Sequence, residues 1–578
     1  MAGLLLAIGR RAGWAPQVVR QLAPALRHYP WLSTRTVQAE PFALALVLHH
    51  NVEPPVWHTT STPQVVVFGE YLHDAGDRLA SDLAAHAAAG RWGALRNGNG
   101  LYNLVVWDGE RRRLVLANDA TGALLLFRAR YPDGWIWSSE PGALPRAGRL
   151  DVAGLRSLVS IGYQADGRTL DDEITAMPPA TTDVVQLAGE RITHERHRGL
   201  PEPAGRCAAF DAAYGELLRD AVGARLRGAG QIELALTGGL DSRLLLGETL
   251  AAGHEVRTFT LASGDLRDVR LAQRVAAAAG VEHRTLAAEP APVHRHRSLL
   301  RGALHTTSDW HAAQQLAICG ATRPGRPLLL GFLGDALAGA FVDRRSAATG
   351  VARMRADALA PYRSRSAVSA RSIVWCEEPD ARDTEAVAEL VENLYGRQRR
   401  YISYLVRLAW NFGQPICPFA DVRLLQHALS ASRTELAGQR VRGRRLRRLD
   451  PRLARIATTN DAMAIGPAVP RLARNAIRRT RVMRPIRAVV SVRWGFDYER
   501  RRPLADECRD LVADEAGRRL LAGLSPMATL ALAPLLMDDG LMDDGLTGDG
   551  LMDDGGDARV ATIELVESMM VESMMGAR

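Results

Sequence analysis

Short apolar runs alternate with amphipathic stretches in the middle of the chain. Runs over 232–236, 256–261 and 283–286 predict strands, and residues 268–279 predict a helix between the last two. Residues 206–229 predict a further helix, whose apolar face consists of Phe210, Tyr214, Leu217, Leu218, Val222 and Leu226. This alternation indicates a parallel sheet covered by helices, and such sheets bind ligands at the carboxyl ends of their strands.

The first of these strands runs directly into the most informative segment, Thr237-Gly238-Gly239-Leu240-Asp241-Ser242. Paired glycines allow backbone N–H groups to approach a polyphosphate, and the helix that follows points its positive end at the same place. A carboxylate such as Asp241 is useful beside a phosphate mainly when a hard cation bridges the two, so we expect Asp241 to bind Mg²⁺. Neither GxxxxGK[ST] nor GxGxxG is present here. The alternative is a structural corner whose glycines only permit tight packing.

This segment resembles the SGGxDS pyrophosphate loop of the asparagine synthetase group, which are ATP pyrophosphatases that adenylate a carboxylate. Residues 328–335 resemble the strand and turn that carry the second magnesium ligand of that group, here Asp335. Phe259-Thr260-Leu261 resembles its adenine-side strand, and Asp268 lies where its next helix has an acid. The resemblance implies ATP and Mg²⁺ as cofactors, with Asp241 and Asp335 as metal ligands. The nucleotide-binding residues that it implies are Leu236, Thr237, Gly238, Gly239, Asp241, Ser242, Thr260, Leu261, Gly331 and Gly334.

The N-terminal region resembles the glutaminase half of the same group but lacks its chemistry. Asparagine synthetases open Met-Cys-Gly, whereas this chain opens Met1-Ala2-Gly3, and the glutamine-binding HRGPD-type loop is absent from 49–55. Scaffold segments persist at 103–108, 114–122 and 137–144. The expected architecture is therefore α/β with two domains. Residues 1–195 should form a glutaminase-like, class II amidotransferase (Ntn-type) α+β sandwich without the nucleophile, and residues 205–525 a parallel-sheet ATP-pyrophosphatase domain of the asparagine synthetase type.

The chain contains no lysine, so every one of the 73 Lys and Arg residues is arginine. In asparagine and β-lactam synthetases a lysine near the reaction centre follows a PFxD segment, which here is Pro418–Asp421, and this chain then offers the arginines of 439–448. We take Arg442 as the catalytic candidate among them. Arginine stays protonated, so it can stabilise the charge on an acyl-adenylate but cannot act as a general base. The reaction should therefore use a nucleophile such as a peptide α-amine, whose pKa is about 7.7–8.0.

With these departures from the asparagine synthetase pattern, the chain resembles the lasso peptide macrolactam synthetases. That resemblance, over residues 1 to about 520, implies adenylation of an Asp or Glu side chain in a precursor peptide and attack by its N-terminal amine. The implied partners are the precursor peptide and, in addition, a leader-binding protein and a leader peptidase. A β-lactam synthetase-like enzyme or an ammonia-using asparagine synthetase is the second reading, and a non-catalytic nucleotide-binding scaffold is the third. The two acids oppose the third reading, and the missing lysine weakens the second.

Composition is consistent with a cytoplasmic enzyme. At 578 residues and 47% hydrophobic content the chain can form at least two domains with cores. No apolar run reaches the roughly 18 residues of a membrane span, and the five cysteines form no CxxC pair. A zinc site at His294, His296, His305 and His311 is disfavoured because suitably spaced acidic partners are missing. The net charge of +9 raises the question of nucleic acid, but no recognition module accompanies the arginines.

The C-terminal region differs in composition from the rest. The motif LMDDG occurs three times between 536 and 555, and VESMM occurs twice between 566 and 575. Such short repeats predict a flexible acidic tail over 526–578 rather than a folded unit. An EF-hand is excluded because its ligand spacing is absent.

Overall fold

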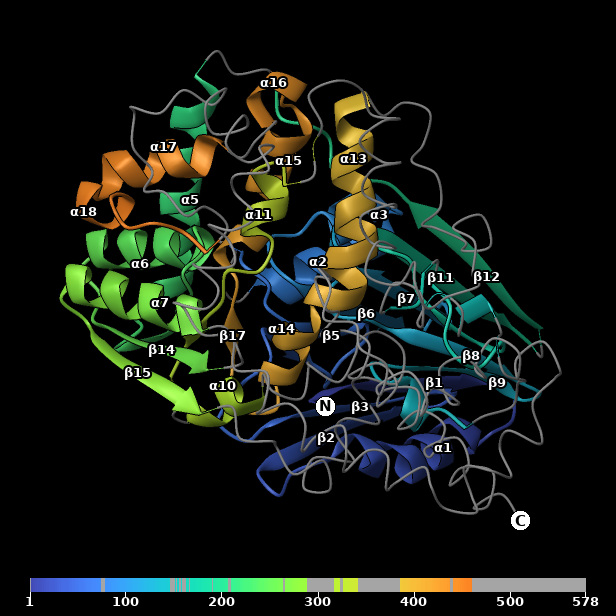
Figure 1. Ribbon diagram of the computed structural model, residues 1–578. Coiled ribbons are helices and arrows are strands. Elements are labelled where there is room, and N and C mark those ends of the chain that lie inside the picture. The colour runs from blue at the N-terminus through green and yellow to red at the C-terminus, as the bar shows by residue number, and fades with distance from the viewer. Residues whose placement is uncertain are drawn as a thin grey trace, which may run out of the picture.

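The computed structural model shows an antiparallel β-sandwich beside a parallel sheet that is flanked by helices (Figure 1). The structure describes residues 2–73, 78–145, 151, 153–154, 157, 163–165, 167–189, 191–205, 209–262, 266–287, 316–322, 326–340, 342, 385–436 and 440–459. The four histidines considered for a zinc site and the C-terminal repeats lie outside these residues. Within them, no helix combines the length and the apolar character that a membrane crossing requires.

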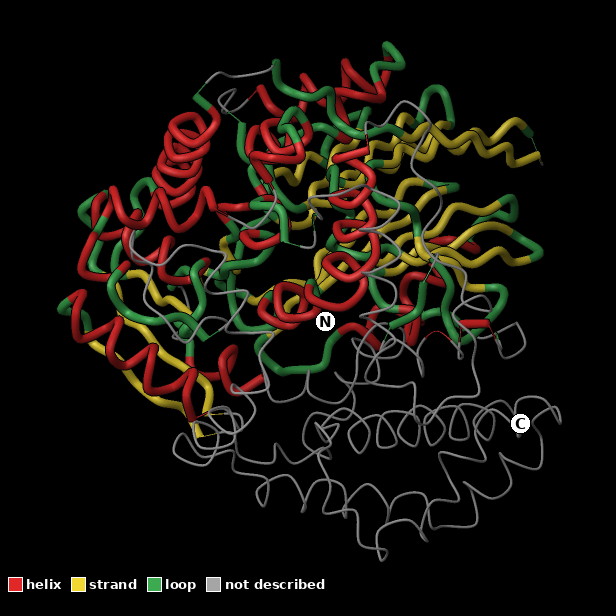
Figure 2. The backbone as a smooth tube through the Cα atoms, turned by 45° about the horizontal axis from the view of Figure 1, so that its top comes forward, coloured by secondary structure: helices red, strands yellow, loops and turns green. Residues whose placement is uncertain are grey.

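The N-terminal domain consists of two six-stranded antiparallel sheets. The first has the order β10 (Ile174–Ala176), β8 (Phe127–Tyr131), β9 (Gly134–Ser138), β1 (Gly3–Gly9), β3 (Phe42–His49) and β2 (Leu32–Ala39). The second has the order β12 (Arg191–Arg198), β11 (Thr181–Ala188), β7 (Arg113–Asn118), β6 (Tyr102–Asp108), β5 (Gln64–Gly69) and β4 (Val56–His58). Figure 2 shows these strands gathered apart from the helical part of the molecule.

Alternating side chains bury both faces of the second sheet. On β6, Val105 and Trp107 face the first sheet, where the Trp107 ring stacks on Phe42 with 5.3 Å between ring centroids. Leu104 and Val106 point the other way and join a separate apolar cluster under the helices. That outer face is covered by α2 (Leu79–Ala88) and α3 (Trp92–Arg96), while α1 (Trp14–Leu22) covers β1 and β3. The result is a sandwich of two sheets between helices, and it confirms the predicted N-terminal fold.

The second domain has a five-stranded parallel sheet. Its order is β15 (Glu282–Ala287), β14 (Val256–Ala262), β13 (Ile232–Ala235), β16 (Leu328–Leu329) and β17 (Pro415–Ile416). The helices before and between these strands are α5 (Phe210–Leu226), α6 (Asp241–Ala251), α7 (Leu266–Ala279), α10 (Leu316–Ala321) and α11 (Gly334–Leu337). Each strand that the hydrophobic pattern predicted over 232–286 is present. Five of the six apolar positions predicted for α5 are buried, and Leu217 is half-buried.

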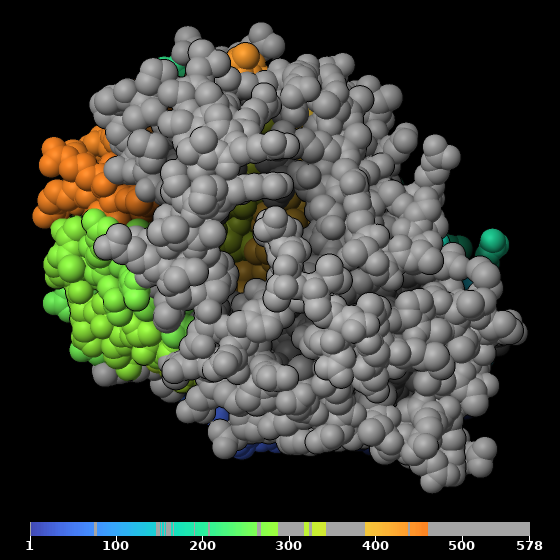
Figure 3. Space-filling model, viewed as in Figure 1, coloured from blue at the N-terminus to red at the C-terminus, as the bar shows by residue number. Residues whose placement is uncertain are grey.

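Later helices close over the sheet. They are α13 (Glu385–Asn393), the π-helical segment η6 (Leu394–Ile402), α14 (Tyr404–Ala409), α15 (Val422–Leu429), α16 (Arg433–Leu436), α17 (Arg440–Leu449) and α18 (Pro451–Ala454). Figure 3 shows α17 and α18, in orange, lying directly against α6 and α7, in green. Glycine permits this close approach, because a Cβ on Gly247 would come within 2.7 Å of Leu449 Cδ2.

Candidate functional site

The predicted loop lies where the order of the parallel sheet changes direction. From β13 the chain continues outward through β14 and β15, and β16 then pairs with the opposite side of β13. The carboxyl ends of β13 and β16 therefore diverge into separate connections, and crevices at such switch points are where open α/β sheets bind ligands. Thr237 to Ser242 follow β13, and Gly331 to Asp335 follow β16. The fold thus brings both predicted acidic segments to one place.

The loop after β13 is closed by its own hydroxyl groups. The N–H of Thr237 donates to Ser242 Oγ at 3.0 Å, and the N–H of Gly239 donates to Thr237 Oγ1 at 3.1 Å. The N–H of Gly238 donates to Asp268 Oδ1 at 2.8 Å. The structure therefore differs from the expectation that the glycine N–H groups face an open phosphate site. Packing also requires glycine at this position, since a Cβ on Gly238 would lie 2.4 Å from Thr459 Oγ1, and contact of Gly238 with a phosphate stays a prediction.

A buried arginine that sequence reasoning missed fixes the loop from beneath. Arg243 has 0% exposure, and its Nη2 donates to Gly238 O at 2.9 Å and to Ala457 O at 3.0 Å. Its Nη1 donates to the carbonyls of Leu453 and Ile456, at 3.0 and 2.7 Å. Burial lowers the pKa of Arg243 to about 10, which leaves it charged at neutral pH. One guanidinium therefore ties the loop to the chain that follows α18.

Asp241 is held between a cation and a second acid. Arg442 of α17 donates from Nη1 to Asp241 Oδ1, and the Arg442 side chain is 5% exposed. Burial raises the pKa of Asp241, and Asp335 raises it further, whereas Arg442 acts in the opposite direction. Burial lowers the pKa of Arg442, but its pairing with Asp241 outweighs this and the net pKa is raised. The three residues taken from the sequence as catalytic thus form one electrostatic unit.

The turn after β16 carries Asp335 toward the same unit. Leu333 adopts φ 70°, in the left-handed region, and thereby directs the chain into α11. Gly334 fits closely against the other loop, because a Cβ there would lie 2.7 Å from Asp241 Cγ. Gln398 Nε2, from η6, donates to Asp335 Oδ1 at 3.3 Å. Gln398 was not predicted, and its position in a π-helical turn gave no sequence signal.

The remaining nucleotide candidates line the base of the loop. Thr260 Oγ1 donates to Leu236 O at 2.6 Å, so this hydroxyl joins the end of β14 to the start of the loop. Leu261 is mostly buried, and Gly331 lies against Asp241, to whose Cβ a Cβ on Gly331 would come within 3.2 Å. These residues adjoin the loop, and their contact with a nucleotide remains a prediction.

The position of the missing nucleophile is filled by side chains of the second domain. The N–H of Ala2 donates to Asn411 Oδ1 at 2.8 Å, and Ala2 is buried. The rings of Phe68 and Trp410 lie 5.6 Å apart between centroids, and both residues line the small cavity beside Ala2. That cavity has a volume of only about 10 Å³. A side chain as large as glutamine does not fit there.

A buried ionic network joins the two domains. Arg225 of α5 donates from Nε to Glu70 Oε2 at 3.0 Å and from Nη1 to Asp421 Oδ2 at 3.1 Å. Asn99 bridges the same groups, accepting from Arg225 Nη2 at 3.1 Å and donating to Asp421 Oδ2 at 2.9 Å. Asp421 is the acid of the PFxD segment, and Glu70 and Asn99 belong to the N-terminal domain. This acid is therefore part of the domain interface.

Three arginines of α17 pair with acidic residues of the same chain. Besides Arg442, Arg444 pairs with Asp211, and Arg445 donates from Nη2 to Glu248 Oε2 at 2.8 Å. These pairs attach α17 to α5 and α6. Three of the six arginines of this helix therefore have a structural role in joining it to its neighbours.

Two conserved-domain families match separate parts of the chain. Residues 213–432 match the asparagine synthase family, and residues 82–197 match the glutamine amidotransferase domain. One similar solved structure is the glutamine phosphoribosylpyrophosphate (PRPP) amidotransferase from B. subtilis complexed with ADP and GMP. It is 11% identical, with a TM-score of 0.23, and the match covers 49% of this chain and 80% of that one. Comparison with curated proteins gives no match.

The family matches agree in order with the two folds described above, and each covers part of its domain. Asparagine synthases are ATP-dependent amide-forming ligases, so ATP-dependent formation of an amide bond is the general activity that the match supports. The loop, the two acids and the parallel sheet all lie within the asparagine synthase match. Strands β6 to β11 of the sandwich and all but the last residue of β12 lie within the amidotransferase match, whereas β1 to β5 precede it. Together the two matches support an asparagine synthetase-like family for this chain.

Proposed function

We propose that the chain is an ATP-dependent peptide macrolactam synthetase of the lasso type. It would adenylate an Asp or Glu side chain of a precursor peptide and join it to the N-terminal amine of that peptide. Two observations together carry the proposal. Asp241, Asp335 and Arg442 form one acid–acid–arginine unit, and the nucleophile position at Ala2 is filled by neighbouring side chains. The first feature supports activation of a carboxylate, and the second argues against ammonia made within the same chain.

In the first step, a carboxylate oxygen of the peptide attacks the α-phosphorus of ATP, and pyrophosphate leaves. Asp241 and Asp335 are a suitable pair of oxygen ligands for Mg²⁺, which typically uses one or two carboxylates together with substrate phosphates. Magnesium would neutralise charge on the phosphates. Arg442 holds Asp241 in place and adds a permanent positive charge beside the phosphates.

In the second step, the peptide amine attacks the acyl carbon, AMP leaves, and the amine nitrogen loses a proton. Arg442 stays protonated and cannot accept that proton. An α-amine is partly unprotonated at neutral pH, because its pKa is about 7.7–8.0. Both reacting groups belong to one peptide, and such intramolecular orientation can supply about 7–11 kcal/mol of the barrier.

Mass spectrometry of a leader-free peptide with an internal Asp or Glu tests the proposal. With ATP and magnesium, the full chain should yield AMP, pyrophosphate and a peptide lighter by one water. Acetylating the peptide N-terminus should abolish ring formation while the carboxylate can still be activated, because an amide nitrogen is a poor nucleophile. Leader-binding and peptidase proteins can be added as further arms.

The β-lactam or asparagine synthetase alternative predicts different products. Free aspartate with ammonium and ATP would give asparagine, and a small β-amino acid substrate would give a lactam, while the peptide would stay unchanged. Either result, or cyclisation that is unaffected by acetylation, would contradict the macrolactam assignment.

A further inference from the structure

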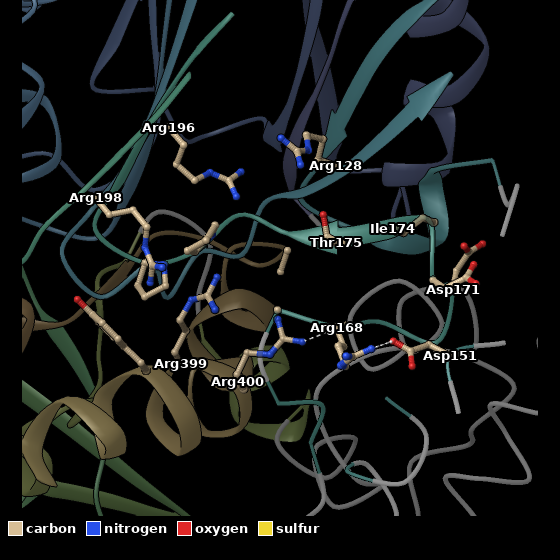
Figure 4. A pocket seen from close by; sticks show the side chains of 16 residues that line it. Arg128, Asp151, Arg168, Asp171, Ile174, Thr175, Arg196, Arg198, Arg399 and Arg400 are labelled. Carbon is tan, nitrogen blue, oxygen red and sulfur yellow. Dashed lines mark hydrogen bonds and ion pairs between the residues drawn. The ribbon is translucent and has the colours of Figure 1, made fainter. Parts of the chain in front are cut away.

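A cavity lined by arginines lies between the sandwich and η6, apart from the acid–acid–arginine unit. Its volume is about 380 Å³, within the range of roughly 300–1000 Å³ that is common for small-molecule sites. Six arginines and three aspartates line it: Arg128, Arg168, Arg196, Arg198, Arg399, Arg400, Asp151, Asp171 and Asp172. Figure 4 shows Arg128 and Arg196 entering from the sandwich and Arg399 and Arg400 entering from η6. Positive charge therefore exceeds negative charge in the lining.

The guanidinium groups are held in place from behind. Arg196 donates to both oxygens of Asp183, at 2.6 and 2.8 Å. The guanidinium carbon of Arg128 lies 4.5 Å from the centroid of the Trp135 ring, and Arg399 Nε donates to Gly122 O at 3.1 Å. Burial lowers the pKa of Arg128 to about 10, and the nearby charge of Arg196 contributes to this, but Arg128 remains charged at neutral pH. The guanidinium groups of Arg128, Arg196 and Arg399 are thus held in fixed positions around the same cavity.

We propose that this cavity is a binding site for a small phosphate-bearing molecule. Arg168 and Arg196 already pair with Asp151 and Asp183, and Arg399 and Arg400 donate to backbone carbonyls, but six lining arginines against the three lining aspartates and Asp183 leave a net positive charge. Guanidinium groups that approach from the sandwich on one side and from η6 on the other can donate to an anion from several directions. A tetrahedral phosphate provides acceptors in several directions, whereas a single planar carboxylate is satisfied by one fork. Binding also offsets the repulsion among arginines that cannot lose their protons. This inference does not rest on the proposed cyclisation.

The cavity and the unit of Asp241, Asp335 and Arg442 are connected through consecutive residues of η6. η6 places Arg399 and Arg400 in the cavity, and the preceding residue, Gln398, donates to Asp335 at 3.3 Å. The same short helical segment therefore contacts both the cavity and Asp335.

Isothermal titration of inorganic pyrophosphate into the full chain tests the site. EDTA is present throughout to remove divalent cations. Without a cation, Asp241 and Asp335 repel pyrophosphate, so pyrophosphate should not bind at the loop of residues 237–242. We expect one binding site in the native protein. Arg128→Gln and Arg198→Gln should each weaken binding roughly tenfold or more, since each removes a charge-assisted hydrogen bond.

Arg130→Gln is the matched control. Arg130 lies on the same strand and over the same Trp135 ring, at 5.7 Å, but it does not line the cavity, so this variant should bind as the native protein does. Circular dichroism establishes that each variant is folded. Absence of binding in the native protein, or equal affinity in all three variants, would overturn the proposal. Citrate that binds as tightly as pyrophosphate would overturn the preference for phosphate.

Discussion

Removing Arg225 should loosen the interface between the two domains. The Arg225 and Asp421 side chains are 0% exposed and that of Glu70 is 8% exposed, so Arg225→Met leaves two carboxylates buried with their shared cation gone. Loss of one partner from a buried pair costs about 3–5 kcal/mol. For a cooperative unit of about 150–250 residues, each 1 kcal/mol lowers the melting temperature by about 2–4 °C. We therefore expect a fall of at least about 6 °C in scanning calorimetry.

The exposed arginine on the same carboxylate is a matched control. Arg423 donates from Nε and Nη2 to Asp421, at 2.9 Å in each bond, but its side chain is 42% exposed. Arg423→Met should therefore cost no more than about 1 kcal/mol. Equal falls in melting temperature for the two variants would refute the reasoning, because burial would then make no difference to the cost.

The pH dependence of this effect has a definite sign. Burial raises the pKa of Glu70 even though Arg225 opposes the shift. A group whose pKa is higher in the folded state than in the unfolded state contributes less stability as pH rises. Without Arg225 this increase becomes larger, so the variant should be more strongly destabilised at pH 8 than at pH 5. A difference from the native protein that does not change with pH would contradict the role of Glu70.

Three further changes test the proposed catalytic residues and the filled position at Ala2. Asp335→Asn should reduce ATP-dependent product roughly 100-fold or more while leaving the circular dichroism spectrum unchanged, because it removes a charge needed beside the phosphates; native turnover under saturating magnesium would show that the ligand is elsewhere. Arg442→Gln should move the acid limb of the pH–rate profile to higher pH, because the charge of Arg442 lowers the pKa of Asp241. The midpoint of that limb should move about one pH unit for each 1.4 kcal/mol of lost pairing energy. An unmoved limb would contradict the proposed role of the Arg442–Asp241 pair. Ala2→Cys should release no ammonia from glutamine, since Trp410 and its neighbours leave about 10 Å³ at that position; measurable glutaminase activity would show that the space can open.

The sequence was most informative where local chemistry and fold coincide. Apolar runs ending in Thr237-Gly238-Gly239 predicted both β13 and the loop, because strand and turn preferences are local properties. Arg442 was chosen from a run of arginines, and the structure places it on Asp241. The two residues lie 201 positions apart in the chain, so only the family resemblance could predict from sequence that they meet.

Contacts between distant segments could not be predicted. Arg243 bonds to carbonyls 210 or more residues away, at Leu453, Ile456 and Ala457, and a backbone carbonyl has no sequence signal of its own. The hydrogen bond from the Gly238 N–H to Asp268 of α7 gave no sequence signal either, and the role of Gly238 in nucleotide binding stays a prediction. Thr459 also contacts this position and gave no signal.

The burial of Ala2 against Asn411 has a consequence for how the protein is made. Their hydrogen bond spans 409 residues, so the sandwich acquires this contact only after most of the chain has been synthesised. At about 5–20 residues per second, the ribosome needs roughly 20–80 s between the two residues. During that interval the surface beside Phe68 lacks Trp410 and stays accessible. Chaperones that bind nascent chains therefore have a defined apolar surface and a defined period in which to act.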